Sequence, residues 1–244
     1  MKECSKSIAR RLRDTNFVRF YFRGDGVDIG GKPDPLSLYA ELFPGITSVK
    51  VWDLEDGDAQ LMAGVKDNTF DFVHSSHCLE HLHNPEEGLK NWLRVLKPGG
   101  FMVVMVPDED LYEQGVFPSS FNTDHKSTFT IFKDRSWSPK SKNLLDMLRS
   151  LGPEARVEKV ELLTGTYRFD LPRFDQTLTP IGECGIEFII RKADAQEARS
   201  GARNRSTKQP PDNQRIHYNQ YRDDMKRLKT GNDAAPPFKN TNEI

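Results

Sequence analysis

The chain has 244 residues, of which 36% are hydrophobic, and this is enough for one full-sized core with appendages. Its 35 basic and 36 acidic residues nearly cancel, so charge gives no argument for binding nucleic acid or a membrane surface. No apolar run approaches the roughly 20 residues that span a bilayer, and the basic start lacks the apolar segment of a secretory signal. Scattered cysteines suit a reducing compartment, so we expect a cytoplasmic protein without disulfides.

The first half of the chain begins with a basic and apolar segment, residues 1–24, which we expect to form a helical extension packed on the main domain. A contact with a membrane or a phosphate group is the alternative. Residues 26–29 indicate a strand that ends in a glycine turn. Residues 36–43 have helical spacing, and Ile46–Trp52 alternates like a strand. The following connection is so short that we expect the sheet to lose an edge strand.

The sequence predicts two buried strands, residues 70–73 and 101–106, with a capped helix between them. Asn84 is suited to cap the free N–H groups, Pro85 favours the first helical position, and Glu87 has the spacing of a capping box. The helix presents one apolar face and should stop at the four residues Lys97-Pro98-Gly99-Gly100.

The second half predicts one more helix, residues 144–151, and two closing strands, residues 157–163 and 186–190. Strands that alternate with helices imply a parallel sheet with right-handed crossovers. We expect the main domain to span residues 25–192, and its two long insertions are predicted at 107–135 and 164–183. Residues 193–244 are polar and almost free of large aliphatic side chains, which predicts a largely disordered tail.

Ligands of such sheets bind beyond the carboxyl ends of the strands. Asp28, Gly30 and Gly31 lie at the end of the first predicted strand, where glycine lets the backbone approach a ligand closely. Asp53 ends the second strand, where a carboxylate can accept hydrogen bonds from both hydroxyls of a ribose. A dinucleotide oxidoreductase would require Gly-x-Gly-x-x-Gly to seat a pyrophosphate, and the sequence from Gly30 to Pro35 lacks that pattern.

Four further motifs follow in order: Asp58-Ala59, Phe70-Asp71-Phe72-Val73, Leu79-Glu80-His81 and Arg94-Val95-Leu96-Lys97-Pro98-Gly99-Gly100. As a set they resemble the class I S-adenosylmethionine (SAM)-dependent methyltransferases, well over residues 27–107 and more loosely to about 192. The resemblance implies an α/β, Rossmann-like three-layer sandwich with a mostly parallel sheet and an antiparallel closing strand. It also implies SAM as cofactor and S-adenosylhomocysteine (SAH) as product. Within the class, the motifs are most similar to a subgroup associated with sugar and surface-polysaccharide biosynthesis.

The resemblance extends the expected cofactor contacts from Asp28, Gly30, Gly31 and Asp53 to Leu54, Asp58, Ala59, Ser75 and His77. In this family the acidic residue of an Asp-Ala pair lies against the adenine amino group. The chain departs from the family at Lys32 and Asp34, where further glycines are usual, and Lys32 is a candidate partner for the methionine carboxylate.

The acceptor is expected to contact the insertion that follows the central strand. Asp124 and His125 are the candidates for catalysis there, because a neighbouring carboxylate can orient a histidine that acts as base. The alternative is a loop held by local side-chain bonds. His77 and His81 are spaced four apart, but no second ligand group is evident in the sequence, so we expect no metal.

These patterns predict an enzyme that methylates an oxygen of a sugar or another small polar metabolite, with a small molecule or a glycan as its partner. Methylation of a base amino group is disfavoured because His74-Ser75-Ser76-His77 replaces the expected Pro-Pro motif, and Cys78 lacks the proline typical of pyrimidine-C5 methylation. Two alternatives stay open: a non-catalytic SAM- or SAH-binding module, and an RNA or protein methyltransferase. The oligomeric state stays open as well.

Overall fold

A computed structural model describes residues 2–204, 220 and 222–226. The chain divides after residue 203 into two units, and the fold below is that of the first unit. Most of the predicted disordered tail, residues 193–244, lies outside the described residues. No helix in the described part of the chain is long and apolar enough to cross a membrane.

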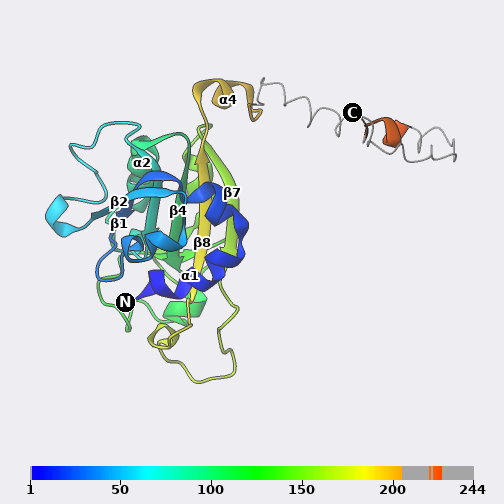
Figure 1. The fold of residues 1–244 in the computed structure, drawn as a ribbon. Helices are drawn as coiled ribbons and strands as arrows, with labels where there is room; N and C mark the ends of the chain where they lie inside the picture. Colours follow the sequence, from blue (N-terminus) through cyan, green and yellow to red (C-terminus); the bar gives the residue numbers. More distant parts are fainter. Residues whose placement is uncertain (1, 205–219, 221, 227–244) are drawn as a thin grey trace. The chain divides into compact units, whose positions relative to one another are not determined.

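The first unit is built on a six-stranded sheet in the order β2-β1-β3-β4-β8-β7 (Figure 1). β1 to β4 are parallel, and β8 runs antiparallel to both of its neighbours. This topology confirms the predicted Rossmann-like α/β fold with an antiparallel closing strand. The six strands are β1 (Gly24–Ile29), β2 (Ile46–Trp52), β3 (Phe70–Ser76), β4 (Leu96–Pro107), β7 (Ala155–Leu162) and β8 (Gly185–Lys192).

Alternating side chains of the sheet bury two apolar clusters, one on each face. Val27, Val73 and Val104 pack with α2 (Pro85–Val95) and α3 (Leu144–Ser150) in the larger cluster. Phe72 and Val103 pack on the other face with α1 (Glu3–Arg13) and the π-helical residues Phe17–Tyr21. α1 therefore covers one face of the sheet (Figure 1). The first unit also contains α4 (Ala195–Ser200) and two short paired strands, β5 (Thr128–Thr130) and β6 (Ser141–Asn143).

The structure differs from the expected elements at three places. Residues 36–42 form a 3₁₀ helix rather than an α-helix. The turn at Lys97–Gly100 belongs to the start of β4, which enters the sheet through an irregular register against β3. The capping box of α2 is half formed: the Asn84 Oδ1 accepts from the Glu87 backbone N–H at 3.2 Å, but the Glu87 carboxylate binds Gln60 instead.

Residues 53–69 contain no strand, so β2 is the edge of the sheet, as the short connection predicted. Side chains of α2 hold this segment instead. Trp92 Nε1 donates to the Ala59 carbonyl at 2.8 Å, and the Arg94 guanidinium donates to the carbonyls of Val65 and Met62 at 2.7 and 3.2 Å. The connection is thereby fixed in space without strand pairing.

Candidate cofactor and acceptor site

Two neighbouring cavities lie beyond the carboxyl ends of β1, β2 and β3. The larger has a volume of about 600 Å³ and the smaller about 180 Å³. Gly30, Lys32, His77 and His81 line both of them. The larger is otherwise lined by Trp52, Asp53, Leu54, Gly57, Asp58, Ala59, Cys78, Leu82, Asp124 and Lys126. The smaller is otherwise lined by Glu3, Cys4, Asp28, Gly31, Asp34, His74, Ser76 and Asn122.

The glycine turn after β1 fits its surroundings only without side chains. Gly30 has φ +69°, and a Cβ there would lie 2.6 Å from Cβ of Cys78. The Asp28 carboxylate supports the turn, since it accepts from the Leu36 backbone N–H and pairs with Nδ1 of His74, both at 2.6 Å. Its oxygens are thus used mainly by the protein, although Asp28 borders the smaller cavity.

A buried polar chain connects this turn to α1. Arg11 lies 3.0 Å from Nε2 of His74 and donates from Nε to Glu187 on β8 at 2.9 Å. Because guanidinium is only a donor, we assign Nε2 of His74 as the acceptor and Nδ1 as the donor to Asp28. All four side chains are at most 1% exposed. Through Arg11 and His74, α1 is therefore linked to Asp28, which supports the glycine turn.

Asp53, directly after β2, lines the larger cavity. Its Oδ1 accepts from the Leu54 N–H at 2.8 Å and its Oδ2 from the Lys32 N–H at 3.1 Å, while the Lys32 ammonium pairs with Glu55. Leu54 is 93% exposed beside it, an apolar side chain with nothing packed over it. Asp58 and Ala59 lie on the same wall.

Ser75 is the one predicted cofactor residue that lines neither cavity. Its hydroxyl donates to the Ile29 carbonyl at 2.9 Å between β3 and β1, and it is fully buried. Side chains alternate along a strand, and the next residue, Ser76, borders the smaller cavity instead.

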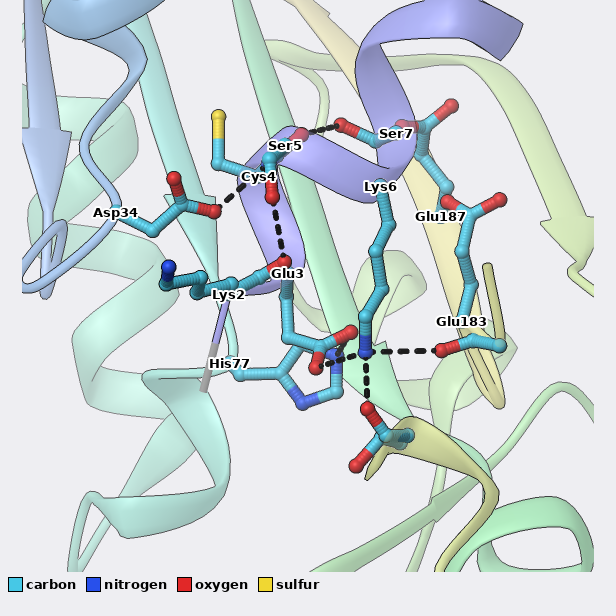
Figure 2. Close-up of polar contacts among 12 residues, drawn as sticks. Lys2, Glu3, Cys4, Ser5, Lys6, Ser7, Asp34, His77, Glu183 and Glu187 are labelled. Carbon is cyan, nitrogen blue, oxygen red and sulfur yellow. Dashed lines mark hydrogen bonds and ion pairs between the residues drawn. The ribbon is translucent and has the colours of Figure 1, made fainter. Parts of the chain in front are cut away.

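His77 lies between the cavities with φ +55°. Its Nδ1 is 3.3 Å from Glu80 and its Nε2 is 3.9 Å from Glu3, which belongs to α1. Burial lowers the pKa of His77, but the carboxylates of Glu80 and Glu3 outweigh it, so the pKa is raised. Figure 2 shows Glu3 beside the His77 ring, with the Lys6 ammonium 2.7 Å from the Glu3 carboxylate. The start of α1 thus forms one wall of the smaller cavity.

The predicted pairing of Asp124 with His125 is wrong. Nδ1 of His125 lies 2.7 Å from Glu113, whereas Oδ2 of Asp124 lies 2.8 Å from Nδ1 of His81. The two neighbours in sequence point to different partners, because Asp124 is on the surface and the His125 side chain is wholly buried. His125 lines neither cavity, so the structure does not place it where a base would contact an acceptor.

Three buried acids that were not predicted from the sequence stand around these histidines: Glu3, Glu80 and Glu113. Glu80 belongs to the Leu79-Glu80-His81 motif, which was the available signal. Burial raises the pKa of Glu80, but His77, His81 and His125 together hold it below its ordinary value. Nothing in the local sequence of Glu113 marks it, because its histidine partner is twelve residues away.

Comparison with known proteins gives a family and a set of similar folds. The family model described as a methyltransferase domain matches residues 8–156. A SAM-dependent methyltransferase from Archaeoglobus fulgidus is 21% identical, over 79% of this chain and 95% of that one, with a TM-score of 0.49. Another from Mesorhizobium loti is 16% identical, over 75% and 96%, with a TM-score of 0.48. The curated proteins give no match.

Proposed function

Because the chain belongs to the methyltransferase domain family, we propose that it transfers the methyl group of SAM to an oxygen of a sugar or of another small polar metabolite. The enzyme is a SAM-dependent methyltransferase, and SAM is its cofactor. The single observation that carries the more detailed proposal is the pair of neighbouring cavities at the carboxyl ends of β1 to β3, which share four lining residues; one has a nucleoside-sized volume and the other is small and polar.

The larger cavity suits the adenosine of SAM. Asp53 offers carboxylate oxygens at its rim, Asp58 and Ala59 offer an acidic and a small residue on one wall, and Leu54 offers an apolar surface. Gly30 lies at its junction with the smaller cavity, where the methionine part would pass close to the backbone. We therefore propose that Asp28 supports the glycine turn from behind and that the cofactor is bound by Gly30, Gly31, Asp53, Leu54, Asp58, Ala59 and His77.

The acceptor side favours a small polar molecule. Asp34, Ser76, His77 and Asn122 are among the residues that line the smaller cavity, of about 180 Å³, which the acceptor would share with the methionine part of SAM. They offer hydrogen-bonding groups for hydroxyls, and little room remains for a stacked base or a peptide side chain. Methyl transfer from a sulfonium is an in-line displacement, so positioning of the acceptor oxygen supplies much of the rate. A base assists only where that oxygen begins as a hydroxyl.

Asp53→Ala tests the cofactor assignment. We expect the dissociation constant for SAM and SAH to rise at least tenfold by calorimetry, roughly the loss of one good hydrogen bond. Asp170→Ala is the matched control, because Asp170 is exposed and lines neither cavity. An unchanged affinity in Asp53→Ala would remove the ribose contact from this residue.

The acceptor class is tested with isotope-labelled SAM and separate pools of monosaccharides and sugar nucleotides, RNA, and peptides. We expect label to enter the sugar pool as a base-stable methyl ether. Label that enters only RNA or peptide would reject the sugar proposal, and tight SAM binding without transfer to any pool would favour a binding module.

A further inference from the structure

Glu80, His81 and His125 form a cluster whose ligand atoms all lie within 4.8 Å of one another. Oε1 of Glu80 is 3.9 Å from Nε2 of His81 and 3.9 Å from Nε2 of His125. Two ligand atoms that each stand about 2.0–2.2 Å from a zinc ion are separated by roughly 3–4 Å. The three side chains therefore already face one point at nearly the required spacing.

The polar atoms that face this point have no hydrogen-bond partner among the described residues. The Glu80 side chain is wholly buried, yet neither of its carboxylate oxygens accepts a hydrogen bond, and Nε2 of His125 also makes no hydrogen bond within the described part of the chain. His77 adds its Nδ1 at 3.3 Å from Glu80, again without hydrogen-bond geometry. A buried polar group without a hydrogen bond costs free energy, so the cluster has unused hydrogen-bonding atoms that a bound ion would employ.

The outer nitrogens of both histidines are already fixed. Nδ1 of His125 is 2.7 Å from Glu113, and Nδ1 of His81 is 2.8 Å from Asp124. A carboxylate at Nδ1 keeps the proton on that nitrogen, so Nε2, which faces Glu80, is the nitrogen that gives up its proton when a metal ion binds. A carboxylate behind a histidine is the usual support of a metal-binding histidine, because it fixes the ring and its tautomer.

The backbone also joins the two segments that carry these residues. The N–H groups of Lys126 and Ser127 both donate to the Glu80 carbonyl, at 2.8 and 3.3 Å. Glu80 and His81 follow β3, and His125 comes from the insertion after β4. The arrangement is thus held by main-chain bonds and does not depend on the side chains meeting by chance.

We infer that Glu80, His81 and His125 bind a divalent first-row transition metal ion, with His77 beside it. Two imidazoles and one carboxylate are a donor set that suits zinc, iron, cobalt or nickel and leaves positions open for other ligands. His81 lines both cavities, so the ion would lie at the edge of the proposed acceptor site. If the proposed function holds, the metal ion would attract a hydroxyl of the acceptor and lower the pKa of that hydroxyl, which favours methyl transfer to oxygen.

The test uses the full chain, free of any affinity tag and stripped with a chelator. We expect calorimetry with Zn²⁺ to give one site per chain, and Co²⁺ to give visible d–d absorption typical of nitrogen and oxygen ligands. Elemental analysis after gel filtration should find one ion retained. No acceptor or SAM is needed for these readouts.

Variants locate the site. His81→Ala and His125→Ala should each weaken Zn²⁺ binding by at least tenfold, and Glu113→Gln should weaken it roughly 10- to 100-fold because it loosens the hold on His125. His83→Ala is the matched control, because His83 is exposed and close in sequence to His81; its affinity should equal that of the wild type. Circular dichroism checks that each variant is folded.

A stripped protein that binds no ion at micromolar concentration would overturn the inference. Equal affinity in wild type, His81→Ala and His125→Ala would also overturn it, because the ion would then be bound elsewhere. SAH titration of the same sample separates the two proposals. If the protein binds SAH but no metal ion, only the metal site is rejected. If it binds the metal ion but not SAH, only the proposed function is rejected.

Discussion

Glu187 shows how a single buried acid can stabilise this protein in a pH-dependent way. Burial would raise its pKa, but the guanidinium groups of Arg11 and Arg10 lower it to about 2. A folded pKa below the unfolded value stabilises the fold above the unfolded pKa of about 4.3, and the contribution disappears as the pH falls toward 2. We expect Glu187→Gln to lose about 3 kcal/mol of unfolding free energy at pH 6, and the gap to wild type to narrow between about pH 4.5 and 2.5.

Urea unfolding of both proteins across this pH range measures the gap directly, because the other acids titrate alike in each. Glu158→Gln is a suitable control, since Glu158 is partly exposed and pairs with Arg191 at the edge of the fold. A gap that stays constant with pH would show that Glu187 does not titrate between its folded and unfolded values.

At this same scale, the sequence predicted residue types better than it predicted partners. Asp53 was expected at the end of a strand, and Asp58 and Ala59 in the connection after it, and all three line the larger cavity. The partner of His125 depends on how a long insertion folds back, so proximity in sequence suggested Asp124 while the structure supplies Glu113. Glu80 and His125 meet for the same reason, and local spacing in the sequence does not reveal such a pair.

The elements with strong local signals were predicted well. Ile46–Trp52 has the predicted bounds, and α2 begins after Asn84 with Pro85 as its first residue. Two other features were not predicted. Packing on α1 decides the conformation of the 3₁₀ helix at residues 36–42, and pairing with β3 decides the early start of β4. Segments shaped by long-range contacts leave little trace in local periodicity.

Arg94, near the end of α2, ties this helix to the segment of residues 53–69. Its guanidinium binds the carbonyls of Met62 and Val65 and the carboxylate of Asp67, and so holds the segment that carries Asp58 and Ala59. Arg94→Met keeps the aliphatic stem but removes these donors. We expect it to lower the unfolding free energy by about 1–3 kcal/mol and to weaken SAH binding severalfold, measured by urea unfolding and calorimetry.

Lys90→Met is the matched control for that variant, because Lys90 is an exposed residue one turn earlier on α2. It should change neither stability nor SAH affinity. If Arg94→Met bound SAH as tightly as wild type, the 53–69 segment would hold its shape without α2, and the absence of an edge strand there would need another explanation.

For the whole molecule, the described residues continue to pack on the domain beyond the expected boundary at 192. Glu197 on α4 is 3% exposed, its carboxylate lies 2.8 Å from Arg191, and its carbonyl accepts from Arg156 at 2.8 Å. The Asp194 side chain caps α4 by accepting from the N–H groups of Gln196 and Glu197. Residues 193–200 therefore close the end of β8, and the first unit of the chain extends to residue 203.

Two truncations measure what this closing segment contributes. A chain of residues 1–203 should melt cooperatively within about 2 °C of the full protein, because it keeps every interaction within the first unit. A chain of residues 1–192 loses the buried partner of Arg191, a loss worth about 3 kcal/mol, and its Tm should fall by roughly 6–12 °C. Glu197→Gln in the 1–203 chain should reproduce much of that decrease. Equal melting temperatures for both truncations would show that the domain ends before α4.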